Sequence, residues 1–414
     1  MRLEKLTRRR FWIMGTHASI FSVLAFCLLF SSTLGLNSIG EPISPYSPSP
    51  VIEGVIIDWD TLERRAPGSD NWPITWAEDD HQYTTWGDGG GFGGSNQDGR
   101  VSLGVARVEG DWDNYRGYNV WGGVDSENPA TREGKSYGIL ALQGRLYMWV
   151  SPGSNYRNYR EARLAISTDK GATWQAEDWA FTQDDEIVLP TFLQFGKEYS
   201  GARDDYVYIY SIRLQDARQL QVQIPGKIDL LRVPIGSLRD RGAYQYFSGL
   251  DEEDSPIWVE DPAARQPVFE NPQGVGWNVS VSYNAGLGRY LLATEHSRSF
   301  EGNLSIFDAE EPWGPWTTVG YYNDWENAGS NFFWNFSNKW ASLDGEEFTL
   351  IYTGIGQSDA WHSVRGRFLV SRPAHTSARG ASSILEERAG NPSSMLMPYA
   401  RSILIPERYD PRIN

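Results

Sequence analysis

One short stretch decides the fold that the sequence predicts, the run Ser167-Thr168-Asp169-Lys170-Gly171-Ala172-Thr173-Trp174. Its spacing is typical of a tight turn between two antiparallel strands. The Asp169 carboxylate can accept backbone N–H groups across the turn, and Gly171 can adopt the positive φ that most other residues avoid. Trp174 is then placed to pack between neighbouring sheets. The run therefore predicts a hairpin with a structural role.

The sequence around this hairpin is also that of an all-β protein. Its periodic segments are short and either alternate in polarity or are wholly apolar, and we expect no amphipathic helix longer than about ten residues. Turn signals such as Asn284-Ala285-Gly286 and Asp344-Gly345 separate the segments. The 414 residues include 18 Trp, 21 Tyr, 17 Phe and 42 Gly, a composition that favours strands and tight turns.

The hairpin fits the pattern S-x-D-x-G-x-T-W and resembles the Asp box of sialidases and many other propellers. This resemblance and the grouping of the strands predict an all-β, five-bladed β-propeller, with six or seven blades as the alternative. The five sheets are expected at about residues 72–107, 136–175, 190–233, 256–318 and 333–370. In such a disc the innermost strands of different blades converge on a central axis.

The two ends of the chain are expected to lie outside the propeller. Residues 1–36 are basic and then apolar, the order of a signal peptide or an N-terminal anchor, and Thr7–Phe11 resembles the twin-arginine export motif. Residues 37–50 read as a Pro- and Ser-rich linker, 51–372 as the propeller domain and 373–414 as an irregular tail. We expect a monomer exported to the periplasm, cell surface or medium, which touches a membrane only through its N-terminal segment.

Charge and cysteine content exclude several classes of function. The formal net charge is −16, which repels nucleic acid and acidic membranes and counts, less strongly, against a polyanionic sugar. The single cysteine, Cys27, lies in the leader, so we expect neither a disulfide nor thiol chemistry. The sequence contains no HExxH or CxxC pattern of a zinc site. We expect no metal at the active site and no cofactor, with a structural calcium ion left open.

The densest group of informative residues lies in the first predicted blade. Asp70 precedes its innermost strand, and Asp88 precedes the glycine-rich run Gly89–Gly94. Such a run lets backbone approach a ligand closely, but it lacks the spacing and the flanking helix of a phosphate-binding loop. We therefore expect Asp88 to form a turn or to orient a substrate rather than to act as a catalyst, and we reject nucleotide binding.

Three segments resemble a family of secreted bacterial propellers that long carried an uncharacterised-domain label and includes endo-D-arabinanases. They are the Asp70 segment with Gly87-Asp88-Gly89, residues 196–210 and residues 340–354, within a diffuse likeness over about 51–370. The layout is also similar to that of five-bladed glycosidases, which carry one acid in the first blade, a supporting Asp in the third and a general acid further on. The resemblance implies a secreted glycoside hydrolase that cleaves a polysaccharide or oligosaccharide.

The same resemblance implies catalytic roles for Asp70, Asp204 and Glu295. Glycoside hydrolysis uses one protonated and one ionised carboxyl, and Glu295 follows an apolar strand, which suits an acid kept protonated by burial. We expect the Asp70 and Glu295 carboxyls about 5–10 Å apart, with Asp204 near enough to tune one of them. Each has a structural alternative: Asp70 can cap a turn, Asp204 can turn the chain, and Glu295 can pair with Arg298.

Aromatic faces and polar side chains supply the predicted substrate contacts. Sugar rings stack on flat apolar faces while polar groups bind their hydroxyls, although most tryptophans are expected to fill the gaps between blades. The predicted substrate-binding residues are Asp88, Trp72, Arg163, Trp277, Asn278, His296, Trp334 and Asn335.

Two other functions stay open. The spacing of Tyr147 and Arg163 is similar to that in propeller lyases that cut ulvan, in which a Tyr acts beside a uronate whose charge an Arg neutralises. The third candidate is a non-catalytic propeller that binds glycan. A lyase would leave unsaturated uronate ends, whereas a binder would release no reducing ends.

Overall fold

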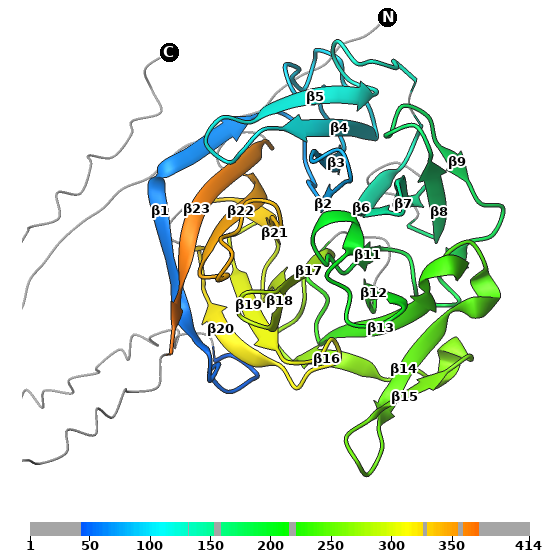
Figure 1. Ribbon diagram of the computed structural model, residues 1–414, viewed down its shortest axis with the longest axis vertical. Helices are drawn as coiled ribbons and strands as arrows, with labels where there is room; N and C mark the ends of the chain where they lie inside the picture. Colours follow the sequence, from blue (N-terminus) through cyan, green and yellow to red (C-terminus); the bar gives the residue numbers. More distant parts are fainter. Residues whose placement is uncertain are drawn as a thin grey trace, which may run out of the picture. The chain divides into compact units, whose positions relative to one another are not determined.

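The computed structural model describes residues 43–371 except 131, 153–158, 215–220, 326–328 and 355–358. These residues form five antiparallel sheets set around a central axis as the blades of a propeller (Figure 1). The predicted five-bladed all-β fold is confirmed, and the six- or seven-bladed alternative is wrong. The predicted leader, residues 1–36, and the tail, residues 373–414, lie outside the described residues, as does the first part of the linker.

Blades one and two begin with their innermost strand and proceed outward. Blade one contains β2 (Ile74–Trp76), β3 (Gln82–Trp86), β4 (Gly104–Glu109) and β5 (Arg116–Trp121). Blade two contains β6 (Lys135–Leu142), β7 (Arg145–Ser151), β8 (Glu161–Ser167), β9 (Gln175–Ala176) and β10 (Phe181–Thr182), the last two both paired with β8.

The other three blades follow the same plan. Blade three contains β11 (Pro190–Phe192), β12 (Tyr206–Ile212), β13 (Gly226–Pro234), β14 (Gln245–Leu250), β15 (Pro256–Val259) and β16 (Pro267–Asn271). Blade four contains β17 (Val279–Asn284), β18 (Arg289–Glu295), β19 (Leu304–Ala309) and β20 (Thr317–Tyr321). Blade five contains β21 (Asn331–Phe336), β22 (Glu347–Gly354), β23 (Trp361–Val370) and β1 (Ile52–Arg65). Helical structure in the described residues is limited to short 3-10 turns.

Two features of this plan differ from the sequence-based expectation. Strand β1 comes from the beginning of the propeller and pairs with β23 from its end, so the two ends of the domain close the fifth blade together. The predicted start of blade four at residue 256 is wrong, because β15 and β16 join blade three and blade four begins at Val279. Alternating polarity identifies a strand but not the sheet that it joins.

The innermost strands give the propeller axis two different ends. Strands β2, β6, β11, β17 and β21 are neighbours around the axis, and a parallel bridge joins Gln194, just after β11, to Ser282 of β17. We call the end at which these strands begin the start end, and the end at which they finish the finish end. Since the second strand of each blade is antiparallel to the first, it runs from the finish end to the start end.

The finish end is cross-linked by the turn that follows β11. Glu198 accepts the backbone N–H of Glu78 in blade one at 2.9 Å and that of Gly144 in blade two at 2.8 Å. The N–H of Gly196 donates to the Asn338 side chain of blade five at 3.1 Å. Gly196 has φ 79° and ψ −158°, a conformation essentially restricted to glycine. One turn of blade three therefore ties three other blades together.

The hairpin at residues 167–174 makes the contacts that its sequence predicts. Asp169 accepts the backbone N–H of Thr173 at 2.9 Å and its hydroxyl at 2.6 Å, and Gly171 has φ 89°. Trp174 packs against the hydrophobic cluster shared by blades one and two. The turn connects β8 to β9 at the finish end, and its role is structural.

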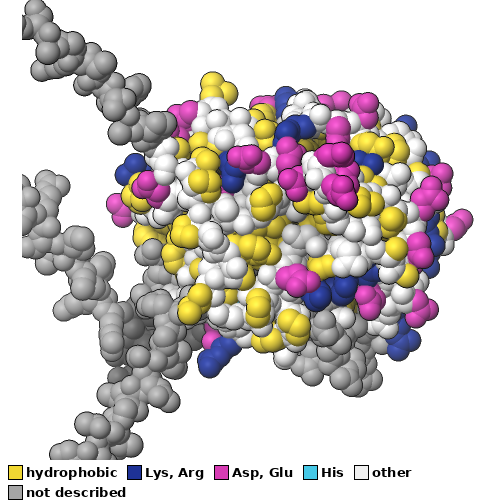
Figure 2. Space-filling model, turned by 90° about the horizontal axis from the view of Figure 1, so that it is seen from below, with side chains coloured by type: hydrophobic (Ala, Val, Ile, Leu, Met, Phe, Trp, Pro, Cys, Tyr) yellow, Lys and Arg dark blue, Asp and Glu magenta, His cyan; other side chains and the backbone are white. Residues whose placement is uncertain are grey.

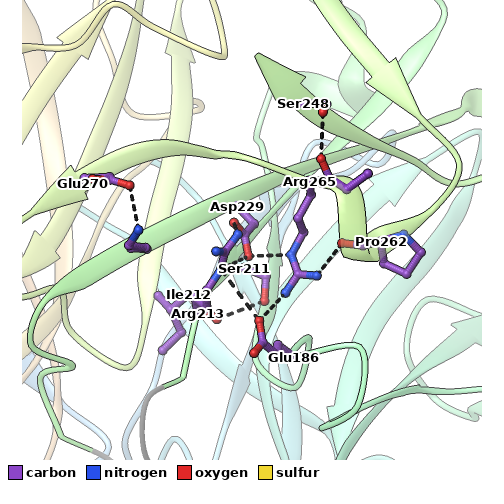
Figure 3. A network of polar contacts seen from close by, with 11 residues as sticks. Glu186, Ser211, Ile212, Arg213, Asp229, Ser248, Pro262, Arg265 and Glu270 are labelled. Carbon is purple, nitrogen blue, oxygen red and sulfur yellow. Dashed lines mark hydrogen bonds and ion pairs between the residues drawn. The ribbon is translucent and has the colours of Figure 1, made fainter.

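In blade three, two arginines and two carboxylates form an ion network in which they pair with one another (Figure 3). The fully buried Asp229 accepts hydrogen bonds from Arg265 at 2.8 Å and from Arg213, and Glu186 pairs with Arg265 at 2.9 Å. A buried carboxylate requires such partners to remain charged. The network joins β13 to the segments before β11 and β16, and both of its guanidinium groups are occupied by carboxylates.

Candidate active site

Asp70 lies at the start end, four residues before β2. Its backbone N–H and C=O each form a 3.0 Å hydrogen bond with Gly87, which fixes the two predicted segments of blade one side by side. The Asn71 amide donates to the Asp70 carboxyl at 2.8 Å and accepts a hydrogen bond from Asn278 of blade four at 3.3 Å. Asp70 is therefore positioned by residues from two blades.

The Asp70 carboxyl is half-buried, and the surrounding protein removes most of its hydration. This burial raises the pKa of Asp70 to about 8. The ammonium of Lys135 opposes the rise, while the nearby carboxyls of Asp359 and Asp88 add to it. A pKa raised in this way favours the protonated form of Asp70 at pH 7, which can donate a proton.

Asp88 lies beside Asp70 in a contrasting environment. Its carboxylate is 2.6 Å from the ammonium of Lys135, which is only 3% exposed, and 3.3 Å from the guanidinium of Arg100. Both cations form ion pairs with the Asp88 carboxylate, and 18% of its side chain reaches solvent. Its φ of 67° is uncommon for a residue other than glycine, and such strain often marks a functional site.

A third carboxyl, that of Asp359 just before β23, completes the cluster. Its backbone C=O accepts the N–H of Gly68 at 2.5 Å, so blade five meets the segment that carries Asp70. Burial raises the pKa of Asp359, and the charge of Asp88 adds to the rise while Lys135 opposes it. Three carboxyls from two blades therefore surround Lys135. We call these three carboxyls, Lys135 and Arg100 the acid cluster.

The glycine-rich run after Asp88 does not serve the role that its sequence suggests. A Cβ at Gly91 would collide with Trp86 and Asn119, and a Cβ at Gly87 would collide with Lys135. Asn119 donates to the carbonyls of Gly90, Phe92 and Val124. The glycines therefore allow close packing of protein on protein, which places Asp88, and the expected close approach of backbone to a ligand is wrong for these contacts.

Glu295 lies at the same end of the axis as Asp70 but does not join the acid cluster. It is fully buried at the end of β18, and one oxygen accepts the backbone N–H of Phe300 at 2.7 Å. Burial raises the pKa of Glu295 to about 8, and the Phe300 amide opposes the rise. Arg298 pairs with Glu301, so the alternative of a Glu295–Arg298 pair is not realised. A substrate cannot reach this carboxyl in the described conformation.

Asp204 is placed at the wrong end of the axis for the expected role. It precedes β12, which begins at the finish end because it is antiparallel to the innermost strand β11. Its carboxylate accepts the backbone N–H of Tyr206 at 3.0 Å and the hydroxyl of Tyr208 at 2.6 Å. The expectation that it tunes Asp70 or Glu295 is wrong, and its structural alternative holds.

Most of the predicted substrate contacts are interior residues. Six side chains are at most 7% exposed, namely Trp72, Trp277, Asn278, Trp334, Asn335 and His296. Trp72 packs against Trp86 and Trp361 in the gap between blades one and five. The expectation that these side chains contact a substrate directly is wrong, because packing between the blades buries their surfaces. Asn278 is connected to Asp70 only indirectly, because it donates to Asn71, which in turn donates to the Asp70 carboxyl.

His296, one of these six, and Arg163, the remaining predicted contact, also lie away from the acid cluster. His296 stacks on Tyr321 at 3.8 Å, and burial lowers its pKa to about 4, so its ring is neutral. Arg163 lies on β8, the third strand from the axis, and donates to Glu161 at 2.7 Å. Its expected partner Tyr147 lies on β7, whose register pairs Tyr147 with Ile166.

Three members of the acid cluster, Lys135, Arg100 and Asp359, were not identified as site residues from the sequence. Lys135 stands immediately before the predicted start of blade two at residue 136, and Asp359 stands just before an apolar strand. A charged residue at the start of an apolar strand was the available signal. Only the fold shows that both strands begin at the end of the axis where Asp70 lies.

Within the described residues, no group of three or more His, Cys, Asp or Glu side chains is arranged to hold a metal ion. A search of the same residues finds no helix with the length and hydrophobicity to span a membrane.

The propeller resembles known proteins at the level of family and fold. A profile of the family described as "Domain of unknown function (DUF4185)" matches residues 138–330, from blade two to blade four. This agrees with the expected likeness to an uncharacterised-domain family, while the expected likeness to endo-D-arabinanases or ulvan lyases is not confirmed. No curated protein matches the sequence.

Several solved structures show a distant likeness to this chain. The GH43_1 enzyme from Xanthomonas citri is 15% identical, with 78% of this chain and 94% of that chain covered and a TM-score of 0.45. The α-L-arabinofuranosidase of Podospora anserina is 12% identical, with 79% and 95% covered and a TM-score of 0.41. RS223-β-xylosidase is 13% identical, with 75% and 96% covered and a TM-score of 0.44. At these identities the likeness concerns the fold and not the activity.

Proposed function

We propose that this protein is a glycoside hydrolase that cleaves a polysaccharide, with Asp70 as the general acid and Asp88 as its ionised partner. The observation that carries the proposal is the contrast between two neighbouring carboxyls at the start end. Asp70 is kept neutral by burial, whereas Asp88 is bound by Lys135 and Arg100. Glycoside hydrolysis needs this combination, a proton for the leaving oxygen and a carboxylate that activates water or attacks directly.

The electrostatics favour a neutral glycan as the substrate. Lys135 and Arg100 are already engaged by Asp88, and the chain has a net charge of −16. Acidic side chains are distributed over the face drawn in Figure 2, with Lys and Arg beside some of them and no broad basic patch on that face. A polyanionic sugar would therefore be repelled. The family resemblance makes D-arabinan a first substrate to test.

The two alternatives receive less support. A lyase of the ulvan type needs a guanidinium that can neutralise a uronate, but Arg163 is bonded to Glu161 and to the backbone carbonyl of Asp178, away from the acid cluster. A non-catalytic glycan binder needs no proton donor. The neutral acid Asp70 beside the strained, ion-paired Asp88 therefore favours an enzyme over a binder. Export through the N-terminal segment is part of the proposal, since extracellular polysaccharide is the substrate.

The test is a glycan panel assayed for new reducing ends. Mature protein, Asp70→Asn and Asp88→Asn are incubated separately with D-arabinan, L-arabinan, xylan and ulvan. We expect the wild-type protein to release reducing ends from a neutral glycan and both variants to lose most of that activity. Products that absorb in the ultraviolet would indicate a lyase, and retention of glycan without new ends would indicate a binder. Either result would contradict the proposal.

A further inference from the structure

The loop between β18 and β19, residues 296–303, carries a strained aromatic residue at the start end. Phe300 has φ 63°, and Ser297 and Gly302 also have positive φ values of 61° and 72°. For a bulky side chain such as Phe this conformation is an outlier that the surroundings must enforce. The chain nevertheless keeps a Phe here rather than a glycine.

The carboxyl of Glu295 accepts a hydrogen bond from the backbone of this strained residue. This carboxyl is fully enclosed, and one oxygen accepts the Phe300 N–H at 2.7 Å, while the other has no hydrogen-bond partner in the described part of the chain. The loop is held from outside by the Ser299 hydroxyl, which accepts the N–H of Val222 from blade three at 2.6 Å. A buried carboxyl with this single bond has a local task, the placement of Phe300.

Phe300 presents an aromatic face to solvent next to a row of buried rings. It is 39% exposed, and its ring packs edge-on against Phe332 at 5.0 Å and tilted against Trp277 at 6.1 Å. Trp277 in turn packs edge-on against Tyr137 at 5.1 Å. The row thus connects blades two, four and five across the start end.

The row ends beside the acid cluster. Tyr137 lies on β6, two residues after Lys135 of the acid cluster. Burial raises the pKa of Tyr137 well above its ordinary value, its hydrogen-bonded neighbour Tyr159 adds to the rise, and Asp70 and Asp88 contribute less. Phe300 is therefore the exposed end of a row of rings that leads away from the candidate catalytic pair. Two ring contacts, of 6.1 Å and 5.1 Å between centroids, separate Phe300 from Tyr137.

We propose that Phe300 stacks a sugar ring of an extended neutral glycan at a subsite beyond the acid pair, and that Glu295 is the residue that positions it. This inference rests on the proposed glycoside hydrolase function. An exposed aromatic face is the surface on which the apolar face of a sugar ring packs. The role of Glu295 is then positioning and not proton transfer to the substrate. The protein should bind long chains better than short ones.

The test is binding by an inactive protein, because binding does not require that the proposed chemistry be right. Asp70→Asn, alone or combined with Phe300→Ala, is titrated calorimetrically with disaccharides and hexasaccharides prepared from D-arabinan, L-arabinan and xylan. We expect Phe300→Ala to weaken binding of the hexasaccharide about tenfold, the size of one lost aromatic contact, and to leave disaccharide binding unchanged. Leu343→Ala is the matched control, since Leu343 is a fully exposed apolar side chain at the finish end.

The positioning role of Glu295 has its own readout in the active protein. Glu295→Gln keeps an oxygen that can accept the Phe300 N–H, so it should retain both KM and kcat for long substrates. Glu295→Ala should raise KM for long substrates about as much as Phe300→Ala while kcat stays within about twofold. If Glu295→Ala does not fold, the comparison of Phe300→Ala with Leu343→Ala decides alone.

The outcomes separate this inference from the proposed function. Hexasaccharide binding that depends on Phe300 without any cleavage by wild-type protein would support the subsite and overturn the hydrolase. Cleavage that is insensitive to Phe300→Ala at every chain length would support the hydrolase and overturn the subsite. A collapse of kcat in Glu295→Gln would also overturn the inference, because it would make Glu295 a proton donor.

Discussion

The start end and the finish end of the propeller axis are both rich in charged side chains, but they use them in opposite ways. At the finish end Asp80 lies between two ammonium groups, those of Lys197 at 3.1 Å and Lys339 at 3.3 Å. Although burial opposes it, the hydrogen bond from Lys197 holds the pKa of Asp80 below its ordinary value. At the start end Lys135 is shared among three carboxyls, and burial raises the pKa of Asp70 to about 8.

The difference separates an end whose paired charges add stability from the end at which we propose that the chemistry takes place. Carboxylates that are fully paired stabilise a fold and remain ionised. A group of carboxyls with too few cations retains a proton at neutral pH, which costs stability and supplies an acid. The predictions below change one end at a time.

The largest effect is expected from the neutral acid itself. Asp70→Asn replaces a protonated carboxyl with a group of the same shape that cannot donate a proton, so activity should fall by roughly 10²–10⁴. Because no buried charge is created, thermal stability should be unchanged or higher. Reducing-end assays and thermal unfolding of the same preparation check both statements. Loss of activity through unfolding would contradict the catalytic role.

The next effect is on stability at the start end. Lys135→Met leaves Asp88 without its buried counter-ion, which should lower the free energy of unfolding by about 3–5 kcal/mol. Adding Asp88→Asn should restore part of this loss, since the uncompensated charge is removed. Denaturant unfolding of the two single variants and the double variant measures the coupling. Additive effects would show that the pair at 2.6 Å contributes nothing.

A smaller effect is expected at the finish end. Gly196→Ala forces a side chain onto a backbone with φ 79° and ψ −158°, which should destabilise the fold by about 1–3 kcal/mol. Activity per folded molecule should not change, because the residue lies at the end opposite the acid cluster. Unfolding curves and the reducing-end assay test the two parts separately. A drop in activity at full stability would mean that the ends are coupled.

The smallest effect concerns pH and Glu295. Its pKa is raised from 4.5 to about 8, so the folded protein holds a proton that the unfolded chain releases. The stability from this proton is complete below the unfolded pKa and is lost as the pH rises to about 8. Glu295→Gln stays neutral at every pH. Between about pH 5 and pH 8 the free energy of unfolding of the wild type should therefore decrease by at least about 1 kcal/mol more than that of the variant. Identical pH dependence would contradict the buried, neutral state.

The fold could be predicted further than the site. Alternation, turn signals and the run at 167–174 were sufficient for five blades, because strands and hairpins are local features. The closure by β1 could not be predicted, since it pairs residues about 300 positions apart in the sequence, such as Ile52 and Val370. Strand periodicity carries no information about such partners.

The site shows the same limit at the level of single residues. Asp70 and Asp88 stood out because they flank the first strands of blade one, and the structure brings them together. Asp204 was misplaced because its strand runs in the opposite direction to the innermost strand. Glu295 was recognised as buried, but burial alone does not say whether a carboxyl faces a substrate or a backbone N–H. Lys135 and Asp359 became visible only when the blades were assembled.

The central claim is that Asp70 stays protonated beside the ion-paired Asp88 at neutral pH. Infrared difference spectra of wild-type protein minus Asp70→Asn, recorded from acid to alkaline pH, isolate the carboxyl band of Asp70. The account predicts a protonated band that persists at pH 7 and disappears near pH 8. A band that is already that of a carboxylate above the ordinary pKa of 3.8 would contradict it.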